Sequence, residues 1–240
     1  MRLKKFQTTK DLASIIDQTF LKKDATAEEI KKVCLETKQY QFRGLCVFPK
    51  HTKLVKNLLK DTGIKVITLI DEPTGMSSHR RRLAMALQAK KDGSDEIDVV
   101  MKIDYFKNEL YDKVFQDLKE ICQILPTKVI IGSGYLTDEE IKKASALVKE
   151  AGAICVKTAT LKDPLDNFEL KEKAKHVRLM REAAPGILVK AAGAIRTLAD
   201  LKLMLQAGAD IIGTSSGKEI VDEARQQKST SQLEAWRQSE

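Results

Sequence analysis

Short apolar runs alternate along this chain with longer segments in which apolar residues recur every three or four positions. Continuous apolar runs are typical of strands buried on both faces, and the wider spacing is typical of amphipathic helices. The alternation predicts eight strand–helix units of about 30 residues each. The predicted strands lie at about 15–17, 44–48, 65–70, 96–101, 128–131, 154–157, 187–190 and 210–213.

The segments between these strands carry recognisable helix ends. Thr26 with Glu29, and Thr137 with Glu140, form capping boxes, in which each side chain covers a free amide of the first turn. Glycine just past the last helical residue is a common stop signal, and Ala-Gly-Ala occurs in this place at 151–153 and 207–209. Further helices are predicted at about 51–61, from Ser77 or Ser78 onward, at 109–123 and at 197–206.

Eight such units in 240 residues fit a single-domain (β/α)8 TIM barrel. An open, doubly wound sheet is the second interpretation. The barrel is predicted to occupy residues 1–225, and the polar segment 226–240 is predicted to be a C-terminal helix or tail.

Composition places the chain among ordinary globular proteins of the cytoplasm. Hydrophobic residues make up 42% and charged residues 32%, and no apolar run approaches the roughly 18 residues of a membrane span. The N-terminal residues have no apolar core of a secretory signal. The four cysteines are widely spaced without a Cys-x-x-Cys pair, which favours reduced thiols over disulfides or a zinc site. The three histidines are far apart and are expected at the surface.

The formal net charge is +8 at pH 7. A nucleic-acid binder would concentrate basic residues on one face and interleave aromatic residues for base stacking. Here lysines occur in every predicted helix, and aromatic residues make up only 5%. We therefore predict no nucleic-acid partner, although a basic surface would attract an anionic substrate.

Two predicted strands end in a lysine, at Lys157 and Lys190. Burying an unpaired ammonium is costly, so two such lysines on consecutive strands require a partner or a function. In a barrel, catalytic groups lie at the C-terminal ends of the strands. Asp17 and Asp98 fall in the same layer, although each could instead cap a neighbouring turn.

Lysine chemistry explains this arrangement. An amine attacks a carbonyl carbon only when it is unprotonated, and a free lysine at neutral pH is almost wholly ammonium. Burial and a second nearby cation both favour the neutral amine. One lysine would then form a Schiff base, the other would tune it, and a carboxylate would move the proton.

The segment Gly213-Thr-Ser-Ser-Gly217 follows the last predicted strand and precedes a helical segment. Backbone amides and hydroxyls at a helix N-terminus bind anions, and barrels often hold phosphate in the loops after their last two strands. The segment is thus a candidate phosphate site, or only a turn.

These motifs together resemble the deoxyribose-phosphate aldolase family, class I aldolases on a (β/α)8 barrel without a metal. The resemblance runs over nearly the whole chain, and its motifs are specific when they occur together in this order. They lie at 16–19, 46–49, 96–100, 156–158, 189–193 and 213–216.

The resemblance implies a Schiff base on Lys157, a tuning cation at Lys190 and a proton relay through Asp98 with an ordered water. It further implies two sets of binding residues. The substrate would contact Asp17, Thr19, Cys46, Thr158 and Thr160, and the phosphate would contact Gly193, Gly213, Ser215 and Ser216. Cys46 could instead serve packing alone.

Several positions depart from the family pattern. The family usually has Ser-Thr-Gly where this chain has Ala159-Thr160-Leu161, and the second glycine of its Gly-Gly pair is Ala194. A Glu-Thr pair of the family is replaced here by Gly132-Ser133, and its Phe-Pro-x-Gly is replaced by the residues at 72–75. Lost glycines hinder close approach of backbone to a phosphate. The reaction type is therefore predicted more firmly than the substrate.

By this resemblance the chain is expected to cleave 2-deoxy-D-ribose 5-phosphate reversibly to acetaldehyde and D-glyceraldehyde 3-phosphate, a step of nucleoside catabolism. No cofactor, metal, nucleic acid or membrane is expected, and the family suggests a homodimer. Two alternatives stay open. The same mechanism could act on another small aldehyde or an unphosphorylated sugar, or the barrel could have lost catalysis and bind a ligand only.

Overall fold

The computed structural model describes residues 9–161, 163–164 and 170–237. Eight parallel strands close into a barrel in the order β1 to β8, with β8 paired to β1. The strands are β1 (Ile16–Phe20), β2 (Gly44–Val47), β3 (Lys65–Ile70), β4 (Glu96–Val100), β5 (Thr127–Ile130), β6 (Cys155–Lys157), β7 (Leu188–Ala192) and β8 (Ile211–Thr214). The predicted (β/α)8 barrel is confirmed, and the open sheet is wrong.

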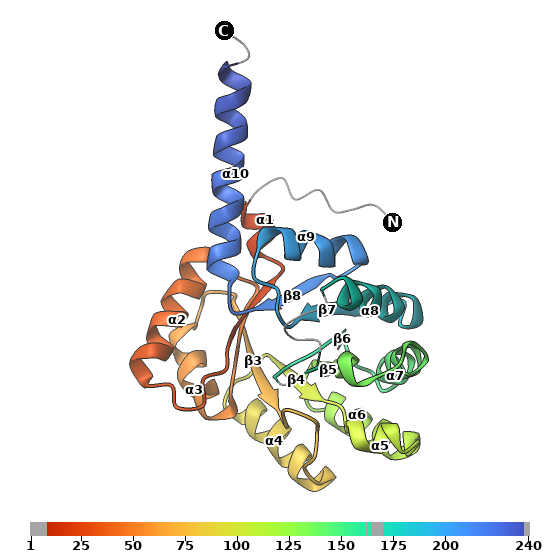
Figure 1. Ribbon diagram of the computed structural model, residues 1–240. Helices are drawn as coiled ribbons and strands as arrows, with labels where there is room; N and C mark the ends of the chain where they lie inside the picture. Colours follow the sequence, from red (N-terminus) through yellow and green to blue (C-terminus); the bar gives the residue numbers. More distant parts are fainter. Residues whose placement is uncertain (1–8, 162, 165–169, 238–240) are drawn as a thin grey trace.

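Helices surround the strands, as Figure 1 shows. They are α1 (Thr9–Ala13), α2 (Ala27–Tyr40), α3 (Pro49–Leu58), α4 (His79–Lys91), α5 (Ile103–Lys107), α6 (Tyr111–Cys122), η1 (Ser133–Tyr135, a 3-10 turn), α7 (Asp138–Glu150), α8 (Leu170–Ala183), α9 (Leu198–Ala207) and α10 (Gly217–Arg237).

The helix ends follow the local chemistry of the sequence. Both predicted capping boxes are present, at the start of α2 and of α7, and Ser78 caps α4. The helix predicted at 109–123 is wrong at its start, because Glu109 has a left-handed φ of 59° and separates α5 from α6. A third box, Thr197 with Asp200, opens α9.

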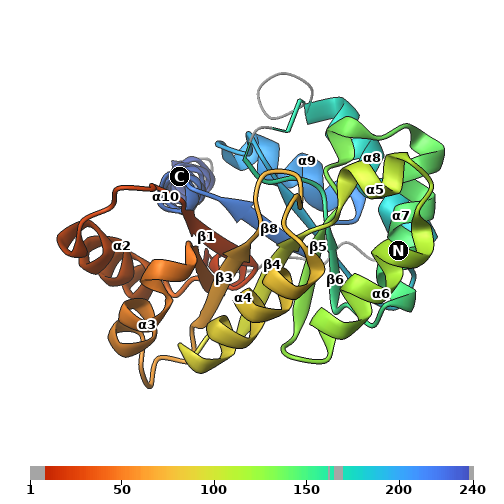
Figure 2. The ribbon, with the colours of Figure 1, turned by 90° about the horizontal axis from the view of Figure 1, so that it is seen from below.

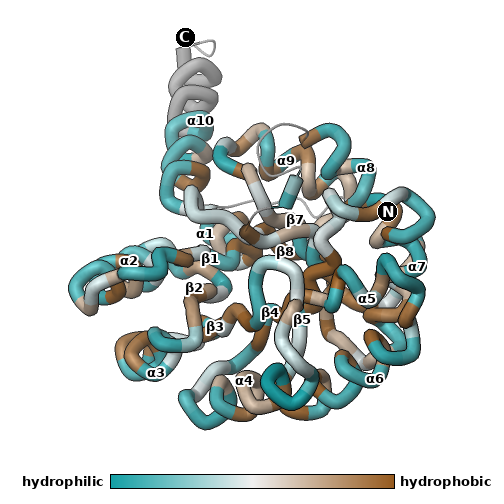
Figure 3. The backbone as a smooth tube through the Cα atoms, turned by 60° about the horizontal axis from the view of Figure 1, so that its bottom comes forward, coloured by the Kyte–Doolittle hydropathy of each residue, from teal (hydrophilic) through white to brown (hydrophobic). Residues whose placement is uncertain are grey.

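The core lies between the strands and the inner faces of the helices. Figure 3 shows hydrophobic stretches gathered in the strands, while the helices alternate hydrophobic and hydrophilic residues. One large cluster of buried apolar residues runs through most of the barrel, and a smaller one lies under α2 and α3. Burying apolar surface in this way supplies most of the driving force for folding.

The last helix, α10, is continuous across the predicted boundary at residue 225. It contacts α1 and α9, and Figure 2 shows it end-on beside α2. Among the described residues, no helix is long and apolar enough to cross a membrane.

The expected surface positions of the histidines are wrong for two of the three. His51 is 8% exposed and His176 is 4% exposed, whereas His79 is partly exposed. His176 lies on the buried face of α8 together with Val177 and Met180. Its position on the helix, and not the polarity of its side chain, therefore determines its burial.

Candidate active site

A network of seven charged side chains fills the centre of the barrel. Because side chains alternate along a strand, residues two apart on β4 point the same way, and Glu96 and Asp98 both face inward. Lysines from the three following strands join them, with Asp17 from β1 and Arg43 from just before β2. The network consists of Asp17, Arg43, Glu96, Asp98, Lys128, Lys157 and Lys190.

Asp98 is the hub of the network. Its Oδ2 accepts hydrogen bonds from Nζ of Lys157 and Nζ of Lys190, each at 2.9 Å. Its Oδ1 accepts one from Nζ of Lys128 at 2.8 Å. Lys157 and Lys190 are also register partners on the neighbouring strands β6 and β7. Sharing one oxygen holds the two ammonium groups side by side, as the sequence predicts.

Further contacts give Lys190, Lys128 and Arg43 at least two carboxylate partners each. Lys190 Nζ lies 2.6 Å from Asp17 Oδ2, and Lys128 Nζ lies 2.7 Å from Glu96 Oε2. Arg43 donates from Nη1 to Asp17 Oδ1 at 2.7 Å and from Nη2 to Glu96 Oε1 at 2.6 Å.

Charge is therefore unevenly compensated in the network. Four cations meet three carboxylates, which leaves one excess positive charge inside the barrel. Lys157 alone of the four has a single carboxylate within 4.0 Å among the described residues. Buried charge without full compensation is costly, and Lys157 is the cation of the network with the least compensation.

Asp98 and Lys190 are held in their charged forms by their neighbours. Burial would raise the pKa of Asp98, but Lys128, Lys157 and Lys190 together lower that pKa well below its ordinary value. Burial likewise opposes the charged form of Lys190, but Asp17 and Asp98 raise its pKa above the ordinary lysine value. Lys190 is thus a permanent cation at neutral pH.

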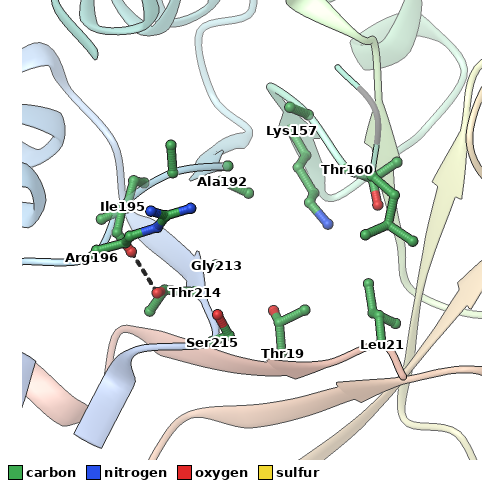
Figure 4. Close-up of a pocket in the computed structure, with 14 residues that line it drawn as sticks. Thr19, Leu21, Lys157, Thr160, Ala192, Ile195, Arg196, Gly213, Thr214 and Ser215 are labelled. Carbon is green, nitrogen blue, oxygen red and sulfur yellow. Dashed lines mark hydrogen bonds between the residues drawn. The ribbon is translucent and has the colours of Figure 1, made fainter. Parts of the chain in front are cut away.

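A pocket of about 340 Å³ opens at the C-terminal ends of β6, β7 and β8. Figure 4 shows the Lys157 amine projecting into it, with Thr19, Thr160 and Ser215 around the opening and the Arg196 guanidinium facing it from another side. Among the described residues that line the pocket, Lys157 is the only lysine. Lys190 is fully buried behind it.

The structure brings three of the four predicted phosphate residues to this pocket. Gly193, Gly213 and Ser215 line it, whereas Ser216 does not. The Ser216 amide instead donates to the hydroxyl of Thr214 at 2.9 Å. Gly213 also touches the network, because a Cβ there would lie 2.9 Å from Cε of Lys190.

The predicted substrate residues divide into two groups. Thr19 and Thr160 line the pocket. Asp17, Cys46 and Thr158 are fully buried and do not line it. Thr158 ties β6 to β7, since its hydroxyl donates to the Ala192 carbonyl and accepts from the Ala192 amide, both at 3.0 Å. Cys46 belongs to the apolar core, where burial raises the pKa of its thiol to about 11.

Three of the positions that depart from the family pattern lie at the same pocket. Ala159, Leu161 and Ala194 all line it. Ala194 has a left-handed φ of 58°, a conformation that glycine adopts without steric cost. The backbone thus keeps the glycine-type turn even though the glycine is absent. Gly132, with φ of 64°, instead packs against Ile103.

Sequence reasoning missed four residues of the site. Glu96, Lys128 and Arg43 complete the buried network, and Arg196 adds a positive charge to the pocket. Glu96 could have been found from the sequence, because it lies two residues before Asp98 on the same strand and so points the same way. Arg43 and Arg196 lie outside the strands, where side-chain direction depends on loop geometry that periodicity does not predict.

Among the described residues, one group of side chains outside this site is spaced closely enough to hold a metal ion. It comprises Asp138, Glu172 and His176. The Lys175 ammonium already lies 2.7 Å from Asp138 and 3.1 Å from Glu172, and it neutralises these carboxylates.

Known proteins are similar to this chain in sequence and in fold. A family model described as DeoC/LacD family aldolase matches residues 12–223. A deoxyribose-phosphate aldolase of Caldanaerobacter subterraneus subsp. tengcongensis is 39% identical over 232 residues, covering 94% of this chain and 98% of its own.

Two solved structures are also similar. One described as "QR15, an Aldolase" has a TM-score of 0.84 and 37% identity, covering 91% of this chain and 97% of its own. A tetrameric deoxyribose phosphate aldolase from Aeropyrum pernix has a TM-score of 0.81 and 29% identity, covering 91% and 92%.

Proposed function

This chain belongs to the DeoC/LacD family of aldolases, and we propose from this premise that it cleaves 2-deoxy-D-ribose 5-phosphate reversibly to acetaldehyde and D-glyceraldehyde 3-phosphate. The reaction would proceed through a Schiff base on Lys157. The observation that carries the proposal is the position of this lysine. It is the least compensated cation of the buried network and the one that reaches the pocket.

The covalent steps follow from an amine at this position. Neutral Lys157 would attack the aldehyde carbon C1 of the open-chain sugar, and loss of water would give an iminium ion. The iminium withdraws electrons, so the C2–C3 bond breaks as the C3 hydroxyl gives up its proton. D-glyceraldehyde 3-phosphate leaves, the enamine carbon C2 takes a proton, and water releases acetaldehyde from the lysine.

Asp98 and an ordered water would carry the protons in these steps. The Asp98 carboxylate lies 2.9 Å from the Lys157 amine, within reach of the proton that must leave before attack. A carboxyl whose pKa lies well below its ordinary value does not retain a proton at neutral pH. Asp98 would therefore pass protons to water rather than store them.

Lys190 would contribute as a fixed charge. It shares an Asp98 oxygen with Lys157 and is held as an ammonium by Asp17 as well. A nearby cation disfavours a second ammonium and so favours the neutral amine of the nucleophile.

The substrate phosphate would bind at the side of the pocket formed by the loops after β7 and β8. Gly193, Gly213 and Ser215 border this region, and the Arg196 guanidinium faces it. Guanidinium groups pair well with phosphate oxygens. Ser216 would support the loop rather than bind, since its amide already donates to Thr214.

An activity assay with a matched pair of variants tests the substrate assignment. Arg196→Gln should raise KM for 2-deoxyribose 5-phosphate roughly tenfold, because a charge-assisted hydrogen bond is lost. KM for unphosphorylated 2-deoxyribose should be unchanged. Arg80→Gln, at an exposed arginine of α4 outside the pocket, is the control. Equal turnover of both sugars by the unmodified protein would favour an aldolase of unphosphorylated substrates, and turnover of neither would favour a ligand-binding barrel.

The protein is further proposed to assemble as a homo-oligomer. The similar aldolase from Aeropyrum pernix is a tetramer, whereas the family analogy drawn from sequence suggests a dimer. Sedimentation equilibrium distinguishes these assemblies from a monomer of 26.9 kDa.

A cytoplasmic location is proposed as well. All four cysteines are free thiols, three of them buried, which suits a reducing compartment. Fractionation of cells that express the tagged protein would test this assignment.

A further inference from the structure

The barrel has a second opening, at the N-terminal ends of β1 to β3. A cleft of about 630 Å³ lies there, bordered by α1, the end of α2 and the loop that leads into β3. The pocket of Lys157 lies at the C-terminal ends of the strands, so the two openings are at opposite ends of the barrel.

This lower cleft is lined by four cations and no carboxylate among the described residues. The cations are Lys10, Lys38, Arg43 and Lys65. No described carboxylate lies within 4.0 Å of any of the three lysines. Like charges gathered in a concave surface repel one another and produce a positive potential that attracts anions.

Arg43 joins this cleft to the catalytic network. Its side chain is 19% exposed, and it lines the cleft. Its guanidinium also donates to Asp17 at 2.7 Å and to Glu96 at 2.6 Å. Asp17 in turn accepts from Lys190 at 2.6 Å. A continuous chain of charged hydrogen bonds therefore runs from the cleft to the amine beside Lys157.

We propose that the lower cleft binds a small polyvalent phosphate compound, and that the bound anion reduces the activity of the site at the other end of the barrel. The four cations define the chemistry of the ligand, since phosphate oxygens accept from ammonium and guanidinium groups. Arg43 would transmit the effect of the bound anion, because among the described residues it is the one side chain of the network that also lines the cleft.

The direction of the effect follows from electrostatics. An anion at Arg43 competes with Asp17 and Glu96 for the guanidinium, and it adds negative charge near the network. Both changes offset the excess positive charge of the buried network, on which the proposed mechanism depends. The ligand should therefore lower kcat and leave substrate binding in the upper pocket unaffected.

Calorimetric titration with pyrophosphate tests the binding step without any assay of activity. Lys38→Gln/Lys65→Gln should weaken pyrophosphate binding at the cleft roughly tenfold, which corresponds to about 1.4 kcal/mol. Lys53→Gln/Lys149→Gln removes the same charge from two exposed lysines outside the cleft and should bind as the unmodified protein does. Arg196→Gln should weaken any pyrophosphate binding in the pocket of Lys157, and so distinguishes it from binding in the lower cleft. Equal affinities in the two double variants would overturn the proposal.

Steady-state kinetics tests the coupling, and this part alone rests on the proposed aldolase function. At saturating 2-deoxyribose 5-phosphate, pyrophosphate should lower kcat of the unmodified protein about fivefold, near the lower end of typical allosteric coupling. Lys38→Gln/Lys65→Gln should abolish this effect, and Lys53→Gln/Lys149→Gln should retain it. Inhibition that is purely competitive, or equal in all variants, would overturn the coupling while the calorimetric result still decides whether the cleft binds.

Discussion

At the scale of single residues, the two central lysines differ in what surrounds their amines. Lys190 has two carboxylates and no opening to the pocket, whereas Lys157 has one carboxylate and projects into the pocket. This difference assigns the nucleophile to Lys157 and the fixed charge to Lys190. Both strand-end lysines and Asp98 could be predicted from the sequence. Which lysine reaches the substrate depends on neighbours such as Arg43 and Glu96, which come from distant parts of the chain.

Replacing Lys157 by Ala should reduce turnover by at least about a thousandfold, because no other described lysine lines the pocket. The fold should persist, since the three remaining cations then match the three carboxylates. Circular dichroism and thermal unfolding check the fold beside the activity assay. Lys102→Ala is the control, as this buried lysine contacts the Ser77 carbonyl outside the network and should keep most activity. Near-normal turnover in Lys157→Ala would contradict the assignment.

Replacing Lys190 by Met should slow the reaction at neutral pH and move the optimum to alkaline values. The change removes the excess positive charge, so Lys157 should hold its proton to higher pH. A profile of kcat/KM against pH measures the shift. Binding of the substrate should change much less than kcat, and a pH profile identical to that of the unmodified protein would rule out the tuning role.

At the scale of elements, the alternation of strands and helices was predictable because each strand is a buried apolar run and several helices begin with a capping box. The errors lie where one residue breaks a pattern. Glu109, the first residue of a predicted helix, has a left-handed φ and lies outside α6, and the helix face that carries His176 turns inward. Gly213 was expected to contact the phosphate together with Gly193, Ser215 and Ser216. In the structure this glycine of β8 also makes room for Lys190.

This role of Gly213 gives a prediction for strand β8. In Gly213→Ala the new Cβ would lie 2.9 Å from Cε of Lys190 and 3.1 Å from Cβ of Ala192, so the lysine must shift. We expect a loss of about 1–3 kcal/mol in stability and a fall in kcat, with the pH profile displaced as in Lys190→Met.

A comparison of kcat with KM separates the two possible roles of Gly213. A residue that served the phosphate alone would change KM and leave the pH profile in place. Gly186→Ala provides the control, because its Cβ would meet nothing within 4 Å while its φ of 94° strains the backbone. It should lose stability without a change in the pH profile.

At the scale of the whole molecule, one barrel places a charged network between two openings. Apolar residues of the strands and helices form the surrounding core, and the network occupies the barrel axis. The closed fold was predictable from strand number and chain length. The lower cleft was not, because its four cations come from α1, α2 and the starts of β2 and β3, and only closure brings these together.

The buried network should make stability depend on pH at both extremes. The pKa values of Asp17 and Asp98 are lower in the folded protein than in the unfolded chain, where they are about 3.9. Their contribution is therefore complete above that value and is lost as the pH falls through the folded pKa. Lys128 and Lys190 have raised pKa values, so their contribution is complete below about 10.4 and is lost at higher pH.

Urea unfolding between pH 2.5 and 9 measures this dependence. The free energy of unfolding should change little between about pH 5 and 9 and fall progressively below pH 4. Asp98→Asn should be less stable at neutral pH and lose less on acidification, whereas Asp104→Asn, at an exposed position, should follow the unmodified protein. Equal acid sensitivity in all three proteins would show that the network does not control stability.

The central claim is that Lys157 forms a covalent bond with the substrate, and borohydride trapping tests it most directly. The protein would be incubated with 2-deoxyribose 5-phosphate, unphosphorylated 2-deoxyribose or acetaldehyde, reduced, digested and analysed by peptide mass spectrometry. We predict a reduced adduct on Lys157, formed most readily with the phosphorylated sugar, and none on Lys190. An adduct on Lys190, or no adduct with any of the three compounds, would contradict the account.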